Sequence, residues 1–152
     1  MCDSSGAIFV VNDAVDVARL VGAPFLHVGQ SDLQIKDARA ILSSGQSVGR
    51  SNNGVVEAQE SEGQGADYLA VGAVYSTSTM GKAGRTAVGA STLVRVKNET
   101  SVPVVAIGGI DASNISDVRG TGVDCACVVS AITLSSNVEK SARELVNIWR
   151  NG

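Results

Sequence analysis

The sequence of 152 residues predicts an α/β fold built on a parallel sheet that curves into a barrel. Residues 102–107 are an almost wholly apolar, β-branched run that stops at Gly108 and Gly109, as expected of a strand buried on both faces. Strand and helix patterns alternate six times with short connections, which indicates repeated βαβ units. Polar or glycine residues follow every strand. A barrel gathers such strand ends around one mouth, whereas an open doubly wound sheet binds ligands only at its switch point.

The first half of the chain supplies three of the expected strands, at residues 7–11, 25–28 and 46–49, the last of them short and weak. Asp13 is placed to cap the helix that follows the first strand, and Gly22 is placed to end it. Apolar residues at helical spacing predict helices over residues 35–42 and 55–64 after the second and third strands.

The second half repeats the pattern, with strands at residues 67–71, 102–107 and 125–129. A long loop over residues 72–85 separates the first of these strands from a short helix at 92–99, and a further helix is expected over 114–119. Asn137 is placed to cap a last helix, whose stripe from Val138 through Leu145 to Trp149 would lie on the sheet. Residues 1–152 then form one domain with about six of the eight units of a TIM-type (β/α) barrel, which is an incomplete barrel.

Composition excludes several classes of protein. A net charge of −3 and an aromatic content of 3% argue against a dedicated nucleic-acid binder. No apolar run reaches membrane-spanning length and no secretory signal opens the chain, so we expect a cytoplasmic protein. Three cysteines make no disulfide framework. Cys125 and Cys127 share one face of a strand and are interpreted as small core residues in a reducing compartment.

Two groups of residues point to chemistry. Asp13 and Asp32 end adjacent strands, where two carboxylates could share a Mg²⁺ ion, although each aspartate could also be only a helix cap or a turn former. Gly108, Gly109 and Ser130 follow the last two strands, where barrels of this type commonly bind phosphate, although glycines there also serve packing alone.

Other polar residues each allow a functional and a structural interpretation. His27 is the only histidine, and inside a strand it is interpreted as a satisfied barrel-wall residue rather than a catalytic one. Thr77 and Thr79 can place both hydroxyls on one side of an extended loop, or belong to an ordinary Ser/Thr-rich loop. Lys82 and Arg85 either meet phosphate or are solvated loop charges.

Six ordered segments together resemble the motifs of thiamine phosphate synthases, from about residue 8 to the last helix. They are residues 11–18 (VNDAVDVA), 27–33 (HVGQSDL), 65–68 (GADY), 71–79 (VGAVYSTST), 103–110 (PVVAIGGI) and 128–132 (VVSAI).

This resemblance implies a (β/α)₈ barrel and a transferase of thiamine biosynthesis. The family joins hydroxymethylpyrimidine diphosphate to hydroxyethylthiazole phosphate and releases pyrophosphate. The implied mechanism is dissociative: Mg²⁺ assists loss of pyrophosphate, and the thiazole nitrogen captures a pyrimidine carbocation. Such a site gains its rate from charge stabilisation and positioning, which fits a chain with no evident catalytic base.

The resemblance also implies roles for individual residues. Asp13 and Asp32 would bind Mg²⁺, and Asn12 and Ser51 would contact the pyrimidine diphosphate. The thiazole phosphate would be bound by Thr77, Ser78, Thr79, Gly109, Val129 and Ser130.

The chain departs from the family pattern in three places. Met80 stands where the family has a lysine after the T-x-T element, and Lys82 follows two residues later. The first strand resembles the third family strand, so the barrel is expected to be N-terminally incomplete and to lack the family's diphosphate-gripping residues. Residues 50–53 (RSNN) differ from the usual V-S-T-H run of the family, and the arginine at position 50 is similar to that of the related thiazole tautomerases.

Three interpretations therefore stay open: a thiamine phosphate synthase, a tautomerase-like enzyme, and a non-catalytic paralogue that binds thiazole phosphate or thiamine phosphate. Retention of Asp13 and Asp32 argues against the tautomerase, and Met80 favours the paralogue. An open barrel leaves two exposed edges, so we expect a homo-oligomer, closure by another chain, or a sequence that is a fragment of a longer product.

Overall fold

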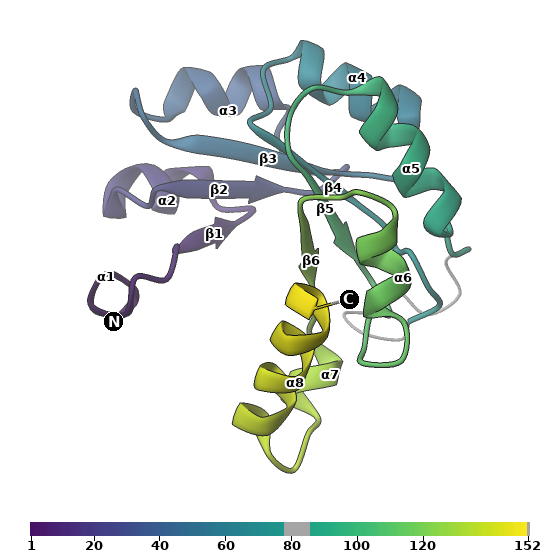
Figure 1. The fold of residues 1–152 in the computed structure, drawn as a ribbon. Helices are drawn as coiled ribbons and strands as arrows, with labels where there is room; N and C mark the ends of the chain where they lie inside the picture. Colours follow the sequence, from purple (N-terminus) through teal and green to yellow (C-terminus); the bar gives the residue numbers. More distant parts are fainter. Residues whose placement is uncertain (78–85, 152) are drawn as a thin grey trace.

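Six parallel strands in simple chain order form the centre of the molecule. The computed structural model describes residues 1–77 and 86–151, and Figure 1 shows the strands side by side with helices along the outside of a curled sheet. The strands are β1 (Val10–Asn12), β2 (Phe25–Val28), β3 (Ser47–Asn52), β4 (Tyr68–Val71), β5 (Val104–Ile107) and β6 (Cys125–Cys127). The helices are α1 (Cys2–Ser5), α2 (Val15–Val21), α3 (Ile35–Ile41), α4 (Val55–Gly63), α5 (Ala90–Glu99), α6 (Ile115–Gly120), α7 (Ser130–Thr133) and α8 (Val138–Asn151).

The convex face of the sheet carries the hydrophobic core. Alternate strand residues such as Leu26, Val48, Leu69 and Val104 are fully buried there, and α3 to α6 pack on the strands beside them. Burial of each such side chain contributes about 1.5–3 kcal/mol to the free energy of folding. This is why the strands read as continuous apolar runs in the sequence.

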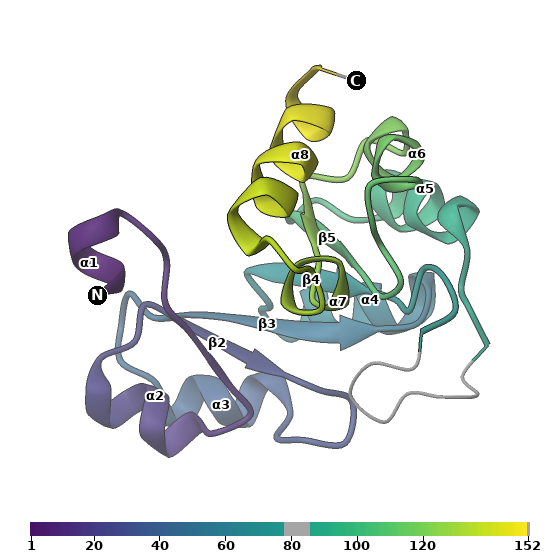
Figure 2. The ribbon, with the colours of Figure 1, turned by 90° about the horizontal axis from the view of Figure 1, so that it is seen from below.

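The concave face carries the residues that alternate with the core. His27, Gly49 and Tyr68 lie beside one another there, because Gly49 is the register partner of both His27 on β2 and Tyr68 on β4. On β5 and β6, Ile107 is the partner of Cys127 on the same face. The concave face is therefore less apolar than the convex one. Figure 2 shows the sheet curving between α2 and α8.

Each of the six predicted strands has a counterpart in the structure, but the bounds of two are corrected. The first is predicted at residues 7–11, whereas β1 begins only at Val10 and ends at Asn12. The sequence predicts a short strand at residues 46–49, whereas β3 is the longest of the described strands and continues through Arg50 to Asn52. The buried Asn52 amide is satisfied by the Arg50 carbonyl at 2.8 Å and by the Ser61 hydroxyl at 2.7 Å. Polar residues that looked like a loop therefore extend the strand.

The two short helices α1 and α7 were not predicted, and α8 confirms its cap but only part of its apolar stripe. The Lys140 N–H donates to Asn137 Oδ1 at 2.9 Å, which is the expected N-cap bond. Leu145 is buried and Trp149 packs against the core, whereas Val138 and Val146 are 53% and 45% exposed.

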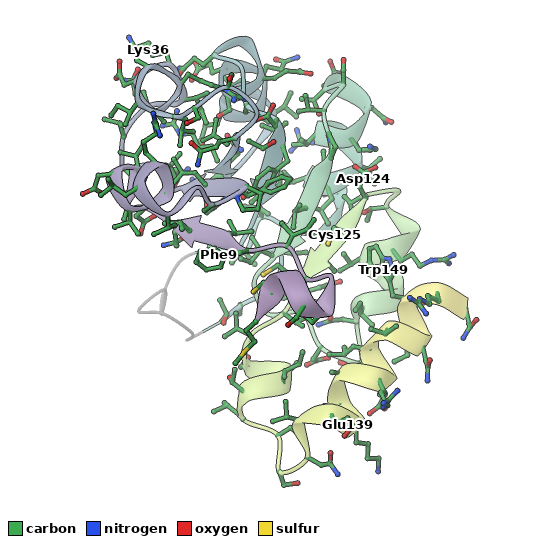
Figure 3. All side chains as sticks on the ribbon, turned by 90° about the vertical axis from the view of Figure 1, so that its left-hand side faces the viewer. Phe9, Lys36, Asp124, Cys125, Glu139 and Trp149 are labelled. Atoms are coloured by element: carbon green, nitrogen blue, oxygen red, sulfur yellow. The ribbon has the colours of Figure 1, made fainter. Side chains whose placement is uncertain are left out.

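The described strands do not close into a barrel, because β1 and β6 each have one neighbour only. Figure 3 labels Phe9 just before β1 and Cys125 on β6, the two outer strands. Both side chains are exposed, so Cys125 is not the core residue that its strand position predicted. The supported fold class is thus an α/β fold with a curled six-stranded parallel sheet. In the residues that the structure describes, no helix has the length and apolarity to cross a membrane.

Candidate functional site

Two carboxyl groups face each other at the carboxyl ends of β1 and β2. The Asn12 amide donates to Asp13 Oδ2 at 2.6 Å, and the Gly29 N–H donates to Asp32 Oδ2 at 2.7 Å. Asp13 has a left-handed backbone, with φ of 63°, which is uncommon for residues other than glycine but is adopted by aspartate and asparagine more readily than by most. Both aspartates are exposed to solvent and accessible to a ligand.

Asp13 does not cap the helix, which corrects the sequence expectation. Helix α2 begins at Val15 after Ala14, and no side chain caps it. The left-handed turn at Asp13 directs the chain away from the capping geometry. The carboxyl group instead lies near that of Asp32. Asp32 does form the expected turn, because its N–H also donates to the Gly29 carbonyl at 3.4 Å.

The proximity of the two carboxyl groups changes their electrostatics. Burial raises the pKa of Asp13, and a hydrogen bond with Asp32 and the charge of Asp32 raise it further, against the Gly29 N–H, which lowers it. Like charges this close repel, so the pair is stabilised by a proton or by a cation. Carboxylate oxygens are the ligands that Mg²⁺ prefers.

Ser51 lies on the next strand, β3, and is held by a histidine. The Ser51 hydroxyl is 2.9 Å from His27 Nε2, and the Tyr68 hydroxyl is 3.0 Å from His27 Nδ1. The His27 and Tyr68 rings are stacked, with centroids 5.8 Å apart. His27 is therefore a satisfied residue of the concave face, as the sequence suggested, but it contacts a candidate substrate-binding hydroxyl.

A polar hollow of about 230 Å³ lies at the carboxyl end of β3 and is lined by Gln30, Arg50, Ser51, Asn52, Glu57 and Glu60. The Gln30 amide donates to Glu57 at 2.5 Å, and the Arg50 guanidinium donates to the Gln30 carbonyl at 3.3 Å. Arg50 alternates with Ser51 along β3 and so lies on the opposite face of the sheet. The arginine that is similar to that of tautomerases is therefore on the helix side.

The predicted phosphate-binding residues line a second cavity, of about 50 Å³, at the carboxyl ends of β5 and β6. Thr77, Gly109, Val129 and Ser130 all lie in its wall, together with Cys127. The structure thus brings together four of the six residues proposed for the thiazole phosphate, while Ser78 and Thr79 lie outside the described residues. Met80 and Lys82 lie outside them as well.

Gly108 and Gly109 are needed here for backbone reasons. Their φ angles are 100° and 67°, in the region that favours glycine. A Cβ on Gly108 would lie 2.6 Å from the Ala73 Cβ, and one on Gly109 would lie 2.8 Å from the Ser76 carbonyl oxygen. The packing interpretation of these glycines is therefore correct. Because both glycines lack a Cβ, the loop after β4 can pack against the loop after β5, and these loops form part of the cavity wall.

Sequence reasoning did not find the part played by Tyr68 and Gly49. The sequence places Tyr68 in a strand and in the G-A-D-Y segment but indicates no role for its side chain. Its contact with His27 depends on β4 register, which no local pattern reveals. One available signal was the glycine at position 49 in the middle of a strand, since such a glycine often marks a close approach of another group.

Fold and site together define a βα-repeat protein with a candidate phosphate pocket and an acidic pair at one end of its sheet. The sequence model of the family described as thiamine monophosphate synthase matches residues 1–132. The chain belongs to this family. Together with the relatives below, this confirms the resemblance to thiamine phosphate synthases.

Relatives cover nearly the whole chain. A thiamine-phosphate synthase of Ruminiclostridium cellulolyticum is 41% identical over 98% of this chain and 70% of its own length. One of Methanosarcina mazei is 39% identical over 97% of this chain and 61% of its own length. The solved structure of thiamine phosphate pyrophosphorylase from Pyrococcus furiosus has a TM-score of 0.89 and 36% identity, over 98% of this chain and 70% of that one. The chain thus spans about two thirds of these relatives.

Proposed function

We propose that this chain carries the catalytic part of a thiamine phosphate synthase, joining hydroxymethylpyrimidine diphosphate to hydroxyethylthiazole phosphate with release of pyrophosphate. The observation that supports it most is that the paired carboxyl groups of Asp13 and Asp32, after β1 and β2, lie at the same carboxyl-end edge of the sheet as the cavity lined by Gly109 and Ser130, after β5 and β6. A diphosphate with a cation and a second phosphate would each find a matching site. The three cysteines are unpaired, which fits a cytoplasmic location.

The acidic pair fits Mg²⁺ by the chemistry of its donors. Asp13 and Asp32 supply two carboxylates, and no group of three or more His, Cys, Asp or Glu side chains suited to a metal is found in the described part of the chain. Mg²⁺ is commonly held by one or two carboxylates together with substrate phosphates and water, so two are enough. When bound, Mg²⁺ would neutralise charge that develops on the departing diphosphate.

Other residues of the chain would position the two substrates. Asn12, which already donates to Asp13, and Ser51 would donate to the pyrimidine diphosphate. Thr77 and Ser130 would donate hydroxyls to the thiazole phosphate, and Gly109 and Val129 would lie against it. Ser78 and Thr79 remain candidates of the same kind. Because no side chain is assigned as catalytic base, the rate gain is ascribed to positioning and to charge stabilisation.

The Mg²⁺ assignment is tested with Asp13→Asn and Asp32→Asn. Asparagine tolerates the left-handed backbone at position 13, so neither variant is expected to unfold. Mg²⁺ with inorganic pyrophosphate should raise the Tm of the wild type, and this increase should vanish in either variant. Asp37→Asn, on α3, is the matched control and should keep the increase. An unchanged increase in the variants would contradict the assignment.

Turnover is measured as thiamine phosphate formed from the two substrates with Mg²⁺. We propose that activity needs further βα units beside β1 and β6, from the same or another chain, because Phe9, Val10 and Leu134 near these strands are exposed apolar residues. Adding the matching N-terminal segment of a longer relative should then raise turnover and lower binding of an apolar dye. No change in either measurement would contradict this proposal.

A second candidate function is a non-catalytic paralogue that binds thiazole phosphate or thiamine phosphate. Met80, in place of a lysine, favours it, since methionine supplies no positive charge to a diphosphate. Tight product binding without turnover would support the paralogue. An increase in turnover in Met80→Lys would identify this position as the limiting one in an enzyme.

A further inference from the structure

An imidazole bridges two hydroxyl groups on the concave face. His27 on β2 lies between Tyr68 on β4, 3.0 Å from Nδ1, and Ser51 on β3, 2.9 Å from Nε2. All three side chains lie on the face that the register assigns to the inside of the curve. Ser51 is nearest to the strand end where Asp13 and Asp32 lie. The bridge therefore runs from the sheet interior toward the candidate diphosphate site.

The absence of a side chain at Gly49 leaves room for the contact between Tyr68 and His27. Tyr68 and His27 are on strands separated by β3, and Gly49 is the residue of β3 that lies between them. A Cβ at Gly49 would lie 2.2 Å from the Tyr68 ring atoms Cε1 and Cζ. The tyrosine ring thus occupies the space over Gly49 and reaches across one strand to the imidazole. Gly49 does not have a positive φ, so this contact is its evident requirement.

The hydrogen-bond partners set the direction of the protons. A neutral imidazole has one N–H donor and one acceptor nitrogen. Burial, followed by the Cys127 thiol, raises the pKa of Tyr68 to about 12, so its hydroxyl keeps a proton to donate. Among the described residues His27 is the hydrogen-bond partner found for that hydroxyl. Donation from Tyr68 to Nδ1 leaves the imidazole proton on Nε2, where it is donated to the Ser51 oxygen.

We infer that His27 and Tyr68 are positioning residues, which fix the Nε2–H tautomer and so leave the Ser51 hydroxyl proton directed toward an incoming diphosphate oxygen. This inference rests on the proposed role of Ser51 in binding the pyrimidine diphosphate. In the opposite tautomer, Ser51 would donate to His27 and present only oxygen lone pairs, which repel a phosphate. The hydrogen bonds through His27 thus leave the Ser51 hydroxyl free to act as a donor to the diphosphate.

The tautomer can be measured directly, because His27 is the only histidine in the chain. A two-bond ¹H–¹⁵N correlation spectrum of the wild-type chain without a histidine tag should show one imidazole, protonated at Nε2. Tyr68→Phe keeps the ring and removes the donor, and should move the population toward the Nδ1–H form. Gly49→Ala should do the same by displacing the ring. A wild-type imidazole protonated at Nδ1 would overturn the inference without any variant.

Ligand binding supplies the second measurement. Inorganic pyrophosphate with Mg²⁺ should shift the His27 resonances in the wild type, and Ser51→Ala should abolish the shift. Ser47→Ala is the matched control, since Ser47 lies on the same face of β3 as Ser51 but two residues before Gly49, at the other end of the strand. It should leave the shift in place. A shift that persists in Ser51→Ala would overturn the inference, because the signal would not pass through the hydroxyl.

Steady-state kinetics separate this inference from the proposed function. Loss of one hydrogen bond is worth about 1 kcal/mol, so Tyr68→Phe should raise the KM for the pyrimidine diphosphate about fivefold and leave that for the thiazole phosphate unchanged. Adding Tyr68→Phe to Ser51→Ala should have no further effect. A wild type with no turnover but with the Nε2–H form and the pyrophosphate shift would refute the reaction alone. Turnover with an Nδ1–H imidazole would refute the positioning role alone.

Discussion

Tyr68 shows how one residue can be constrained by its surroundings. Its pKa is raised to about 12, first by burial and then by Cys127, whereas the unfolded phenol ionises near pH 10. The folded state therefore gains stability that is complete below pH 10 and is lost as the pH rises from 10 to 12. Its neutral hydroxyl is what the contact with His27 requires.

We predict that Tyr68 remains un-ionised at pH 11 in the folded protein. The chain has two tyrosines, and the pKa of the other, Tyr75, is also raised, first by burial. Tyrosinate absorbance should therefore show a step near pH 12 in the wild type that is missing in Tyr68→Phe. Circular dichroism in the same samples reports whether the fold is intact. Complete ionisation of both tyrosines by pH 10.5 in a folded sample would contradict the prediction.

We predict that the two cysteines of β6 differ in reactivity, because they differ in burial. Burial, followed by the neighbouring Cys125, raises the pKa of Cys127, while Cys125 is exposed. Because the thiolate is the reacting form, iodoacetamide at pH 8 should modify Cys125 on the order of tenfold faster than Cys127. Peptide mass spectrometry over time measures both rates in one sample. Equal rates in folded protein, with equal rates also in urea, would contradict this expectation.

At the scale of the element, an aspartate just before a strand links that strand to the neighbouring strand and to a helix. Asp124, just before β6, accepts from the Val104 N–H of β5 at 2.7 Å and from Lys97 of α5 at 2.6 Å. Asp67, just before β4, repeats the arrangement by accepting from the Val48 N–H of β3 at 2.6 Å and pairing with Arg39 of α3. Each aspartate follows a glycine and a buried apolar residue, so the G-x-D segment joins two strands and a helix.

Substitutions at Asp124 should separate the hydrogen bond from the ion pair. Asp124→Ala leaves the N–H of the fully buried Val104 without this acceptor and should cost about 1–3 kcal/mol in the free energy of unfolding. Asp124→Asn keeps an acceptor and loses only an ion pair whose aspartate is 42% exposed, so the cost should be below about 1 kcal/mol. Lys97→Met should match the asparagine variant. Urea unfolding measures all three, and equal costs for alanine and asparagine would contradict the assignment.

The end of α4 offers two glycines in open space that differ in backbone angle. Apart from chain neighbours and the backbone of α4 itself, no heavy atom lies within 4 Å of a Cβ built on Gly63 or on Gly65, but of the two only Gly65 has a positive φ, of 90°. Gly63→Ala should therefore stabilise the protein by about 0.4–1 kcal/mol, because alanine restricts the unfolded chain. Gly65→Ala should destabilise it by about 1 kcal/mol or more. Thermal unfolding measures both, and effects of the same sign would contradict the explanation.

Elements were predictable from sequence where local pattern decides them. The Asn137 cap and the Gly22 helix end depend on neighbours in the chain, and both are confirmed. The length of β3 and the conformation of Asp13 were not predictable, since Asn52 is satisfied by Ser61 from α4 and Asp13 turns against the strand end of β2. Residues whose partners come from other elements are where sequence reasoning failed.

At the scale of the molecule, the candidate site is divided between the two halves of the sheet. Asp13, Asp32 and Ser51 belong to β1–β3 and their loops, while Gly109 and Ser130 follow β5 and β6. The sequence places both groups of residues directly after predicted strands. Because parallel strands end at the same edge of a sheet, the sequence also predicts that both groups lie at that edge. The contact between Ser51, His27 and Tyr68 needed the register of three strands and was therefore outside its reach.

Carboxyl groups with lowered and with raised pKa values make opposite contributions to the stability of the protein at low pH. The Ser113 side-chain and backbone hydrogen bonds lower the pKa of Asp111. Burial raises that of Asp124, but Lys97 and the Val104 N–H outweigh it and the pKa is lowered. Both groups contribute stability that is present above the unfolded pKa, near 4, and is lost as the pH falls through the folded pKa. Asp13, with a raised pKa, has the opposite sign: its repulsion from Asp32 is relieved as the pH falls.

The same substitution at two positions should therefore change the pH profile in opposite directions. Asp124→Asn should flatten the loss of stability between pH 5 and pH 3, because the unfolded state no longer takes up that extra proton. Asp13→Asn should steepen the loss and raise stability at pH 7, because it removes a repulsion that acid otherwise relieves. Urea unfolding at each pH in EDTA, which keeps divalent cations away from the acidic pair, measures both slopes. Parallel profiles for the two variants would show that the Asp13 and Asp32 carboxyl groups do not interact in solution, and the proposed cation site would then lack its electrostatic basis.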